Sequence, residues 1–299
     1  MKSSKVLFLG IVALVSGGAF ISCTPPIEGE LTPLVKFQDY VYEVLLVSPC
    51  WSSDGLNVYF TSIWDSLEFT RTYRVWCVDV KTEAMEQIST GNISIVGIDI
   101  SKEDNLCVTY WGELFHVLDA HTWTELVSLE PQASGVSYSP RFSYESDRVF
   151  YYMYEIPSGS TYLRKVNLKD STDEVILTVK QGGYCDPGPG DTLFAIHDTI
   201  YNVKSNKRIP IGIDLPSTGT VNWNPADPSE LLISTGVKHE LYIFDLETRE
   251  LTELNVKATN SNTILDAKFS PDGKRIVLAT KSIGDAVCYE KIWIFDPVK

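Results

Sequence analysis

The sequence predicts an all-β fold in which six four-stranded sheets form a closed ring, and three observations support this. Runs of four to seven β-branched, aromatic and aliphatic residues alternate with Gly, Pro, Asn, Asp and Ser, which is the pattern of short strands and turns. Two independent features recur along the chain with the same period. The 7 Trp, 15 Tyr and 12 Phe residues among 299 can fill a large core, which excludes an intrinsically disordered chain.

The first periodic feature is a polar turn before a strand. It reads Ser52-Ser53-Asp54-Gly55 near the start of the chain and Ser270-Pro271-Asp272-Gly273 near its end. Degenerate copies begin at Ser101, Ser143, Pro189 and Asn224. Asp54 and Asp272 are 218 residues apart, so five intervals give about 43.6 residues each. Gly55 and Gly273 can adopt the positive φ that a tight turn between two strands requires.

The second periodic feature is a strand that ends in Asp or Asn. These strands end at Asp79, Asp119, Asn167, Asn202, Asp245 and Asp296. The first and last are 217 residues apart, or about 43.4 residues per interval. About 43 residues hold four short strands with their turns, which is one propeller blade. We therefore predict a six-bladed β-propeller with four-stranded antiparallel blades over residues 30–299, and turns opened by Asp79, Asp119 and Asp245.

The end of the chain predicts how the ring closes. The sixth repeat stops at Lys299, directly after its third strand, and so lacks an outer strand. The segment Glu30–Leu34 can supply it, and Pro33 is tolerable there because an outermost strand is a sheet edge. We therefore expect the N-terminal segment to complete blade six. The alternative is a frayed N-terminal linker.

The Ser-Pro-Asp-Gly turn at residues 270–273 resembles the repeat of TolB-like propellers, and the resemblance covers nearly the whole mature chain. The copy at residues 52–55 departs from it at Ser53. The resemblance implies a single six-bladed domain with a peptide segment that enters the funnel. Because the family serves many roles, this implication is an analogy.

The N-terminus resembles a bacterial lipoprotein precursor. Lys2 and Lys5 precede a 15-residue apolar stretch, Val6–Phe20, which is short for a bilayer crossing and typical of a secretory signal. Ser22 and Cys23 then match the lipobox. We expect a signal peptide over residues 1–22, lipidation of Cys23 and a short linker over residues 23–29. The alternative is a conventional signal peptide without lipidation.

The net charge and the predicted cellular location limit the possible partners. The signal segment carries two lysines and no acid, so its removal takes the formal charge from −14 to −16. A surface this acidic repels nucleic acid, which we exclude as a partner. We expect a cell-envelope protein held to the membrane by its lipid anchor, facing the periplasm or the outside. Thr24 after the cysteine favours the outer membrane if the cell is Gram-negative.

Motifs for catalysis and cofactors are missing. The chain has no Gly-x-Ser-x-Gly elbow, no His-Glu-x-x-His pair and no phosphate-binding Gly-Lys-Ser/Thr loop. Oligogalacturonate lyases, which resemble this propeller class, hold a metal with several histidines near the axis. The four histidines here are widely spaced at His116, His121, His197 and His239. We therefore expect no metal site, no cofactor and no motif-defined catalytic residue.

Five cysteines remain after Cys23, at positions 50, 77, 107, 185 and 288. The number is odd, so at least one has no partner within the chain. Cys77 and Cys107 lie in apolar strand runs and are expected to be small buried side chains. Cys288 is the more exposed candidate.

Loop lengths give the main functional hypothesis. Long connections between the second and third strands of blades one, three and six would share one face with the funnel mouth. The expected rim residues are Trp64, Phe69, Arg71 and Tyr154, with His239 as a further binding candidate. We expect a non-catalytic propeller that binds an envelope protein, peptide or glycan through this face. These aromatic residues could instead cover their own blade edges.

Two alternatives to the binding protein remain open. One is an envelope lyase or hydrolase that acts on a polysaccharide or small lactone, with carboxylates such as Asp65, Asp186 or Asp285 at the funnel. The other is a structural subunit of a larger envelope assembly. Acids or histidines that line one end of the axial channel would favour the enzyme.

Overall fold

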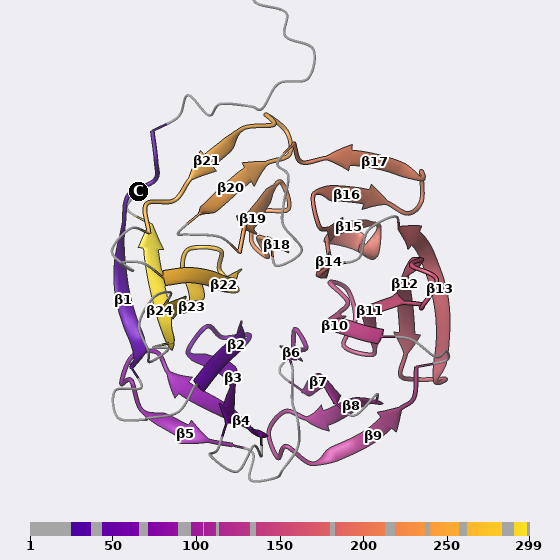
Figure 1. The fold of residues 1–299 in the computed structure, drawn as a ribbon, viewed down its shortest axis with the longest axis horizontal. Coiled ribbons are helices and arrows are strands. Elements are labelled where there is room, and N and C mark those ends of the chain that lie inside the picture. Colours follow the sequence, from indigo (N-terminus) through magenta and orange to yellow (C-terminus); the bar gives the residue numbers. More distant parts are fainter. Residues whose placement is uncertain are drawn as a thin grey trace, which may run out of the picture.

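Six four-stranded antiparallel sheets follow one another around a central axis in the computed structural model (Figure 1). It describes residues 25–36, 44–65, 71–88, 97–103, 105–111, 114–131, 136–179, 183–212, 219–236, 240–256, 262–282 and 290–297. The strand order confirms the predicted six-bladed β-propeller. Cys23 and the predicted signal segment lie outside the described residues, and so do Phe69, His239, Asp285 and Cys288.

The strands of each blade, from the axis outward, are called a to d. Blade one consists of β2 (Val44–Trp51), β3 (Asn57–Asp65), β4 (Arg71–Asp79) and β5 (Met85–Gln87). Blade two consists of β6 (Ile98–Ile100), β7 (Leu106–Trp111), β8 (Leu114–Asp119) and β9 (Glu125–Leu129). Blade three consists of β10 (Val136–Phe142), β11 (Val149–Glu155), β12 (Thr161–Asn167) and β13 (Thr172–Val179).

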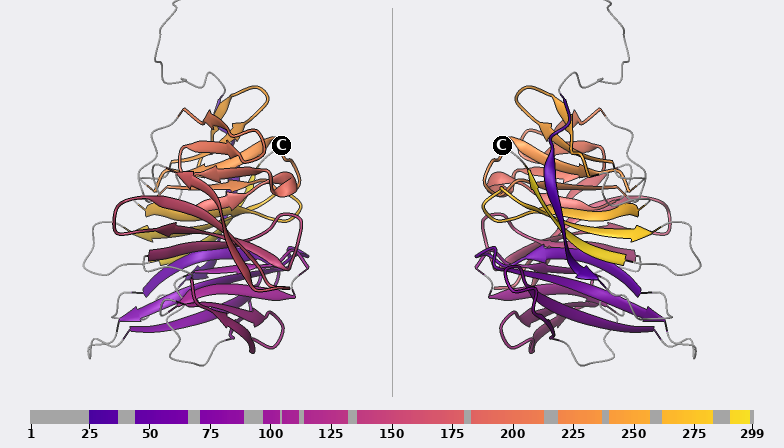
Figure 2. Two further views of the ribbon diagram at one scale, coloured as in Figure 1. Left: turned by 90° about the vertical axis from the view of Figure 1, so that its right-hand side faces the viewer. Right: turned by 90° about the vertical axis from the view of Figure 1, so that its left-hand side faces the viewer.

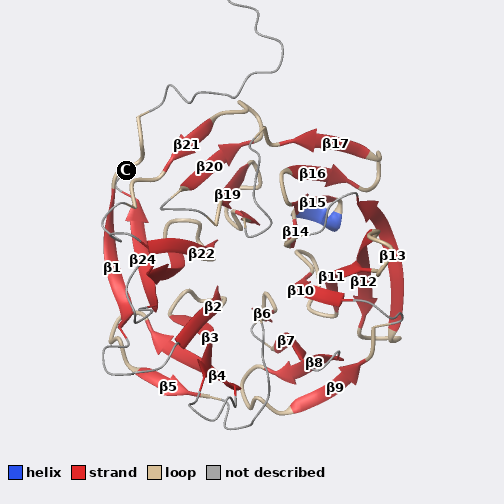
Figure 3. Cartoon of the chain, in the orientation of Figure 1, coloured by secondary structure: helices blue, strands red, loops and turns tan. Residues whose placement is uncertain are grey.

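Blade four consists of β14 (Cys185–Pro187), β15 (Leu193–Ile196), β16 (Thr199–Asn202) and β17 (Lys207–Pro210), and it carries a short 3-10 helix, η1 (Pro189–Asp191), between its first two strands (Figure 3). Blade five consists of β18 (Thr220–Trp223), β19 (Glu230–Ser234), β20 (Leu241–Asp245) and β21 (Leu251–Glu253). Blade six consists of β22 (Asn262–Phe269), β23 (Ile276–Ser282), β24 (Glu290–Pro297) and, as its outer strand, β1 (Gly29–Lys36).

The N-terminal strand closes the ring, as the sequence predicts. β1 pairs antiparallel with β24, and Pro33 stands opposite Trp293 beside a break in the register. The segment before β1 also reaches blade five, because the Ile27 N–H donates to the Glu253 carbonyl at 2.8 Å and the Asn255 N–H donates to the Ile27 carbonyl at 2.9 Å. The same N-terminal segment thus joins two blades, and the side views show β1 along the outer edge of the disc (Figure 2).

The two periodic features occupy the turns predicted for them. Ser52 and Ser270 each donate a side-chain hydrogen bond of 2.6 Å to the Asp two residues on, and Gly55 and Gly273 both have φ of 68°. Asp79 accepts hydrogen bonds from the backbone N–H groups of residues 81 and 82 at the turn between strands c and d. These bonds lower the pKa of its carboxyl below the usual range. Asp119 and Asp245 open the corresponding turns in blades two and five.

The core lies between neighbouring blades. Phe115 of blade two packs against Phe150 and Tyr152 of blade three, with ring centroids 5.3 Å and 4.5 Å apart. Cys107 is buried, as predicted, in the cluster between blades one and two, and burial raises the pKa of its thiol, whereas Cys77 is only half-buried. Within the described ranges, no helical segment has the length and apolar character that a bilayer crossing requires.

Candidate functional site

A cavity of about 570 Å³ lies on the axis, at the end of the disc where strand a of each blade turns into strand b. We call this end the a–b face and the opposite end the b–c face. Turn residues of all blades except the fourth line the cavity, among them Ser53, Lys102, Tyr144, Pro225 and Pro271. The sequence places the funnel mouth on the b–c face, whereas this cavity lies on the a–b face.

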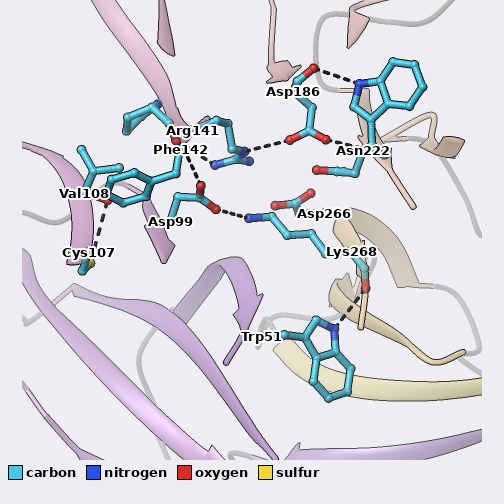
Figure 4. Close-up of polar contacts among 12 residues, drawn as sticks. Trp51, Asp99, Cys107, Val108, Arg141, Phe142, Asp186, Asn222, Asp266 and Lys268 are labelled. Carbon is cyan, nitrogen blue, oxygen red and sulfur yellow. Dashed lines mark hydrogen bonds and ion pairs between the residues drawn. The ribbon is translucent and has the colours of Figure 1, made fainter. Parts of the chain in front are cut away.

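One position of strand a carries the charged residues of the site. It is occupied in blade order by Cys50, Asp99, Arg141, Asp186, Asn222 and Lys268. Each of the six stands next to the last residue of its strand. Five of these six residues line the cavity, and the sixth, Arg141, is buried between Asp99 and Asp186 (Figure 4).

Asp99 joins three blades. One of its carboxylate oxygens accepts a hydrogen bond from the Lys268 ammonium of blade six at 3.1 Å. The other accepts from the backbone N–H of Phe142 of blade three at 2.8 Å. The side chains of Asp99 and Lys268 are 16% and 12% exposed, so this ion pair is largely shielded from solvent.

Asp186 of blade four is held by hydrogen bonds from Trp223 of blade five. Its carboxylate accepts from the backbone N–H of Trp223 at 2.8 Å, and the Trp223 indole N–H donates to the Asp186 carbonyl at 3.1 Å. Burial raises the pKa of Asp186 to about 7, although the Arg141 guanidinium and the Trp223 N–H act in the opposite direction. Asp186 therefore exchanges its proton near neutral pH.

Arg141 is a buried cation between carboxylates. Its guanidinium donates to the Pro140 carbonyl at 3.2 Å, and its Nε lies 3.9 Å from Asp186. Burial opposes the charge, but the carboxylates of Asp99, Asp266 and Asp186 outweigh burial and raise the pKa of Arg141. Asp266, two residues before Lys268 on the same strand, is 4% exposed.

Apolar and aromatic groups complete the lining. Trp51, Phe142, Trp223 and Phe269 follow the charged position in their blades, and Tyr144 stands at the mouth. The Trp51 indole N–H donates to the Lys268 carbonyl at 3.2 Å, and the Tyr144 hydroxyl donates to the Pro225 carbonyl at 3.1 Å. A concave site with an aromatic lining and a few placed polar groups is the usual form of a small-molecule site.

The predicted rim residues are not brought into this cavity. Trp64 pairs with Val44 and Thr72, and Arg71 follows the connection from strand b to strand c, so both positions belong to the b–c face. Tyr154 is 1% exposed and packs in the core between blades two and three, so its side chain does not form an exposed rim. Of the three carboxylates named from the sequence, Asp186 lies at the funnel, whereas Asp65 ends strand b of blade one on the b–c face.

Sequence analysis missed Asp99, Arg141, Asn222 and Lys268. A signal for them exists, because in five blades the charged position comes two residues before the turn residue Ser52, Ser101, Ser143, Asn224 or Ser270. A charged side chain at the inner end of an apolar strand is unusual enough to suggest a site. The signal is visible only once the degenerate repeats are aligned with one another.

The described histidines do not form a metal site. His116 lies in strand c of blade two and bonds Glu125 at 2.7 Å, and His197 lies at the turn from strand b to strand c of blade four. Neither lines the axial cavity. Within the ranges that the structure covers, no three His, Cys, Asp or Glu side chains are placed to hold one ion. The described residues therefore do not fit a metal held by several histidines.

Comparisons with solved structures find the same fold. An oligogalacturonate lyase in complex with manganese has 16% sequence identity and a TM-score of 0.54, and the match covers 91% of this chain and 99% of that one. An oligogalacturonate lyase from Vibrio parahaemolyticus has 14% identity and a TM-score of 0.55, with 93% and 95% covered. No protein-family model matches the chain, and no curated protein matches it in sequence.

These comparisons correct the main functional hypothesis. Both solved structures are enzymes, so they overturn the expectations of a non-catalytic binding protein and of a chain that is not an enzyme. At 14% to 16% identity the likeness itself shows the fold, which is a six-bladed β-propeller.

Proposed function

We propose that this protein is a carbohydrate-cleaving enzyme, a lyase or hydrolase, whose active site is the axial cavity on the a–b face. The observation that carries the proposal is that Asp99 and Asp186, from blades two and four, line one cavity in different environments. Asp99 is paired with Lys268, whereas burial raises the pKa of Asp186 to about 7. Two carboxyl groups whose environments differ in this way are suited to separate roles in acid–base chemistry.

In this proposal Asp186 supplies a proton to the leaving group. A general acid works best when its pKa lies near the working pH, and Asp186 meets this condition at neutral pH. The Trp223 N–H fixes one carboxyl oxygen at 2.8 Å. Asp99 is the second carboxylate, and its bonds to Lys268 and to the Phe142 N–H hold it in place on the other side of Arg141.

The lining supports a carbohydrate ligand. Trp51 and Trp223 offer flat apolar surfaces, and Asn222 and the turn serines offer hydrogen-bonding groups. The solved structures with the same fold carry the name oligogalacturonate lyase, which supports a glycan as the substrate class. Their names do not transfer a particular sugar to this chain, because the identity is low.

An activity screen tests the proposal. The purified protein is incubated with a panel of neutral and uronate-containing oligosaccharides, and products are followed by new reducing ends and by mass. We expect at least one member to be cleaved, and Asp186→Asn to lower the rate by about 10² to 10⁴. Asp198→Asn, the same substitution in the same blade on the b–c face, is the matched control and should leave the rate unchanged.

Two results would contradict the proposal. One is a panel on which the folded protein neither binds nor cleaves any sugar. The other is cleavage that Asp186→Asn leaves intact, which would place the chemistry elsewhere in the molecule.

We also propose that the enzyme is a TolB-like propeller made as a lipoprotein precursor and anchored in the cell envelope through Cys23. The supporting features are the basic start, the apolar stretch Val6–Phe20 and the Ser22-Cys23 pair. Labelling cells with a fatty-acid analogue, followed by detergent extraction, tests the anchor. A soluble, unlabelled mature protein would contradict it.

A further inference from the structure

We infer that the axial cavity takes an uncharged sugar and that the cleavage in it is hydrolysis, not elimination. The inference rests on the proposed function and decides between the two reaction classes that it leaves open. It also separates this chain from its structural neighbours, because oligogalacturonate is a polyanion. Three features of the cavity support the inference. They are the balance of its charges, the lack of a metal-binding cluster among the described residues, and its neutral polar lining.

The buried cations of the site do not outnumber its carboxyl groups, so they leave no excess positive charge to bind a polyanion. Among the described residues, the side chains of Asp99, Asp186 and Asp266 surround the buried Arg141, and Lys268 is the second cation beside them. Lys268 is bound to Asp99 at 3.1 Å. The further lining cation, Lys102, is exposed at the mouth, 5.3 Å from the centroid of the Tyr144 ring. The full chain carries a formal charge of −14, so its long-range field also opposes the approach of an acidic oligosaccharide.

Positive charge favours elimination from a uronate, and the two buried cations of this site, Arg141 and Lys268, already face carboxylates. Negative charge builds on the sugar carboxylate when the neighbouring C–H proton is removed, and a metal ion, a free cation or a set of hydrogen-bond donors stabilises it. Lys268 is paired with Asp99 at 3.1 Å, and the carboxylates of Asp99 and Asp266 act on Arg141. Within the described part of the chain, no trio of His, Cys, Asp or Glu is placed to hold an ion. Hydrolysis uses two carboxyl groups and a water molecule, and Asp99 and Asp186 supply two carboxyl groups to the cavity.

The reaction that these groups support is as follows. The bond between the anomeric carbon and the bridging oxygen breaks, and Asp186 gives its proton to that oxygen. A water molecule adds its hydroxyl to the anomeric carbon, and its remaining proton goes to Asp99. Proton exchange with solvent then returns Asp186 to its acid form and Asp99 to its carboxylate. The products together contain one water molecule more than the substrate.

The neutral part of the lining suits hydroxyl groups. Among the serines of the a–b turns, Ser53 is exposed, whereas the hydroxyls of Ser52, Ser101 and Ser143 are bonded within their own turns, and Asn222 lies among the charged residues. The Asn222 amide N–H donates to the Ala267 carbonyl at 2.8 Å, which orients the side chain. Hydroxyl and amide groups match the hydroxyl groups of a neutral sugar without a cost in charge. Trp51 and Trp223 provide apolar surface for the ring of the sugar.

The experiment uses the intact protein in a metal chelator, with two panels of oligosaccharides that differ in charge. One panel contains only neutral sugars and the other contains uronates, and the reaction is run in water enriched in heavy oxygen. Hydrolysis places heavy oxygen in one product, whereas elimination places none and creates a double bond that absorbs ultraviolet light. Asp186→Asn and the control Asp198→Asn are assayed in parallel, with thermal melting as the check on folding.

The expected result is cleavage of a neutral substrate in the chelator, with heavy oxygen in the product and a loss of about 10² or more in Asp186→Asn. An unsaturated product from the uronate panel would overturn the inference while leaving the proposed enzyme in place. Dependence on added metal would overturn it too. If a folded protein acted on neither panel, the proposed function and the inference would fail together.

Discussion

Asp99 of blade two and Lys268 of blade six form an ion pair of 3.1 Å across blade one, although 169 residues separate them in the sequence. The Trp51 indole N–H of blade one donates to the Lys268 carbonyl, so three blades meet at this pair. An ion pair that is shielded from water at both ends is costly to break by removing one partner, because the other charge is left uncompensated.

Lys268→Met tests the cost of breaking this pair. We expect the free energy of unfolding to fall by about 2 to 4 kcal/mol, because Asp99 keeps the Phe142 N–H but loses its cation. Lys165→Met is the control, since the Lys165–Glu174 pair spans 3.5 Å between side chains that are 33% and 60% exposed. It should cost less than about 1 kcal/mol. Equal losses in urea denaturation would show that the axial pair does not hold the blades together.

The pKa of Asp186 predicts an alkaline limit for the reaction. Because Asp186 must be protonated to act as the acid, activity should fall about tenfold per pH unit above roughly pH 7. The measurement is kcat/KM against pH on the best substrate of the screen. Asp198→Asn should show the same fall of kcat/KM with rising pH as the wild type. A profile that stays flat to well above neutral pH would remove Asp186 from the role of acid.

The same pKa predicts how stability depends on pH. The pKa of Asp186 is about 7 in the folded chain, above the ordinary value of 3.8, so between these values the folded state binds more protons than the unfolded one. Proton binding by Asp186 therefore stabilises the folded state. This contribution to the unfolding free energy is complete below pH 3.8 and is lost as pH rises through 7. Asp186→Asn removes this dependence, and the unfolding free energies should diverge by at most about 1.4 kcal/mol per pH unit. Parallel curves for the two proteins would contradict the raised pKa.

Two glycines in equivalent turns predict different costs on substitution by alanine. Gly55 and Gly273 both have φ of 68°, where a Cβ costs about 1 to 2 kcal/mol. A Cβ at Gly55 would meet Arg275 at 3.5 Å, which is ordinary contact, whereas one at Gly273 would collide with the side chain of Asn224 in blade five. Gly273→Ala should therefore lower the melting temperature more than Gly55→Ala. Equal effects would mean that Asn224 moves away without cost.

Two alanine substitutions in the closing strand β1 should differ in their effect on the free energy of unfolding. Leu34 is 7% exposed in the cluster shared by blades six and one, and Thr32 on the same strand is exposed. Leu34→Ala should cost about 2 to 5 kcal/mol in unfolding free energy, and Thr32→Ala about 0.5 kcal/mol or less. If the two variants had the same stability, β1 would not close the ring in solution.

The sequence predicted the architecture because the repeat is carried by local signals. The turns at Ser52 and Ser270, the Asp residues that end strand c, and Pro33 at a sheet edge each act within a few residues of themselves. Such signals survive in degenerate copies, and two of them gave the same period.

The site was predictable only in part, because its residues converge from distant blades. Asp186 was named among the carboxylates of the funnel, whereas Asp99 and Lys268 lie in blades whose order around the axis decides whether they meet. The face was predicted from loop length, but the cavity is lined by the ends of the inner strands and by the a–b turns. The lengths of the b–c loops contain no information about these residues.

The most direct test of the account is a crystal structure of Asp186→Asn with an oligosaccharide that the wild type cleaves. The account predicts sugar density in the axial cavity, with a bridging oxygen beside residue 186 and a ring against Trp51 or Trp223. Sugar bound on the b–c face, with the axial cavity holding only water, would contradict the central claim that this cavity is the active site.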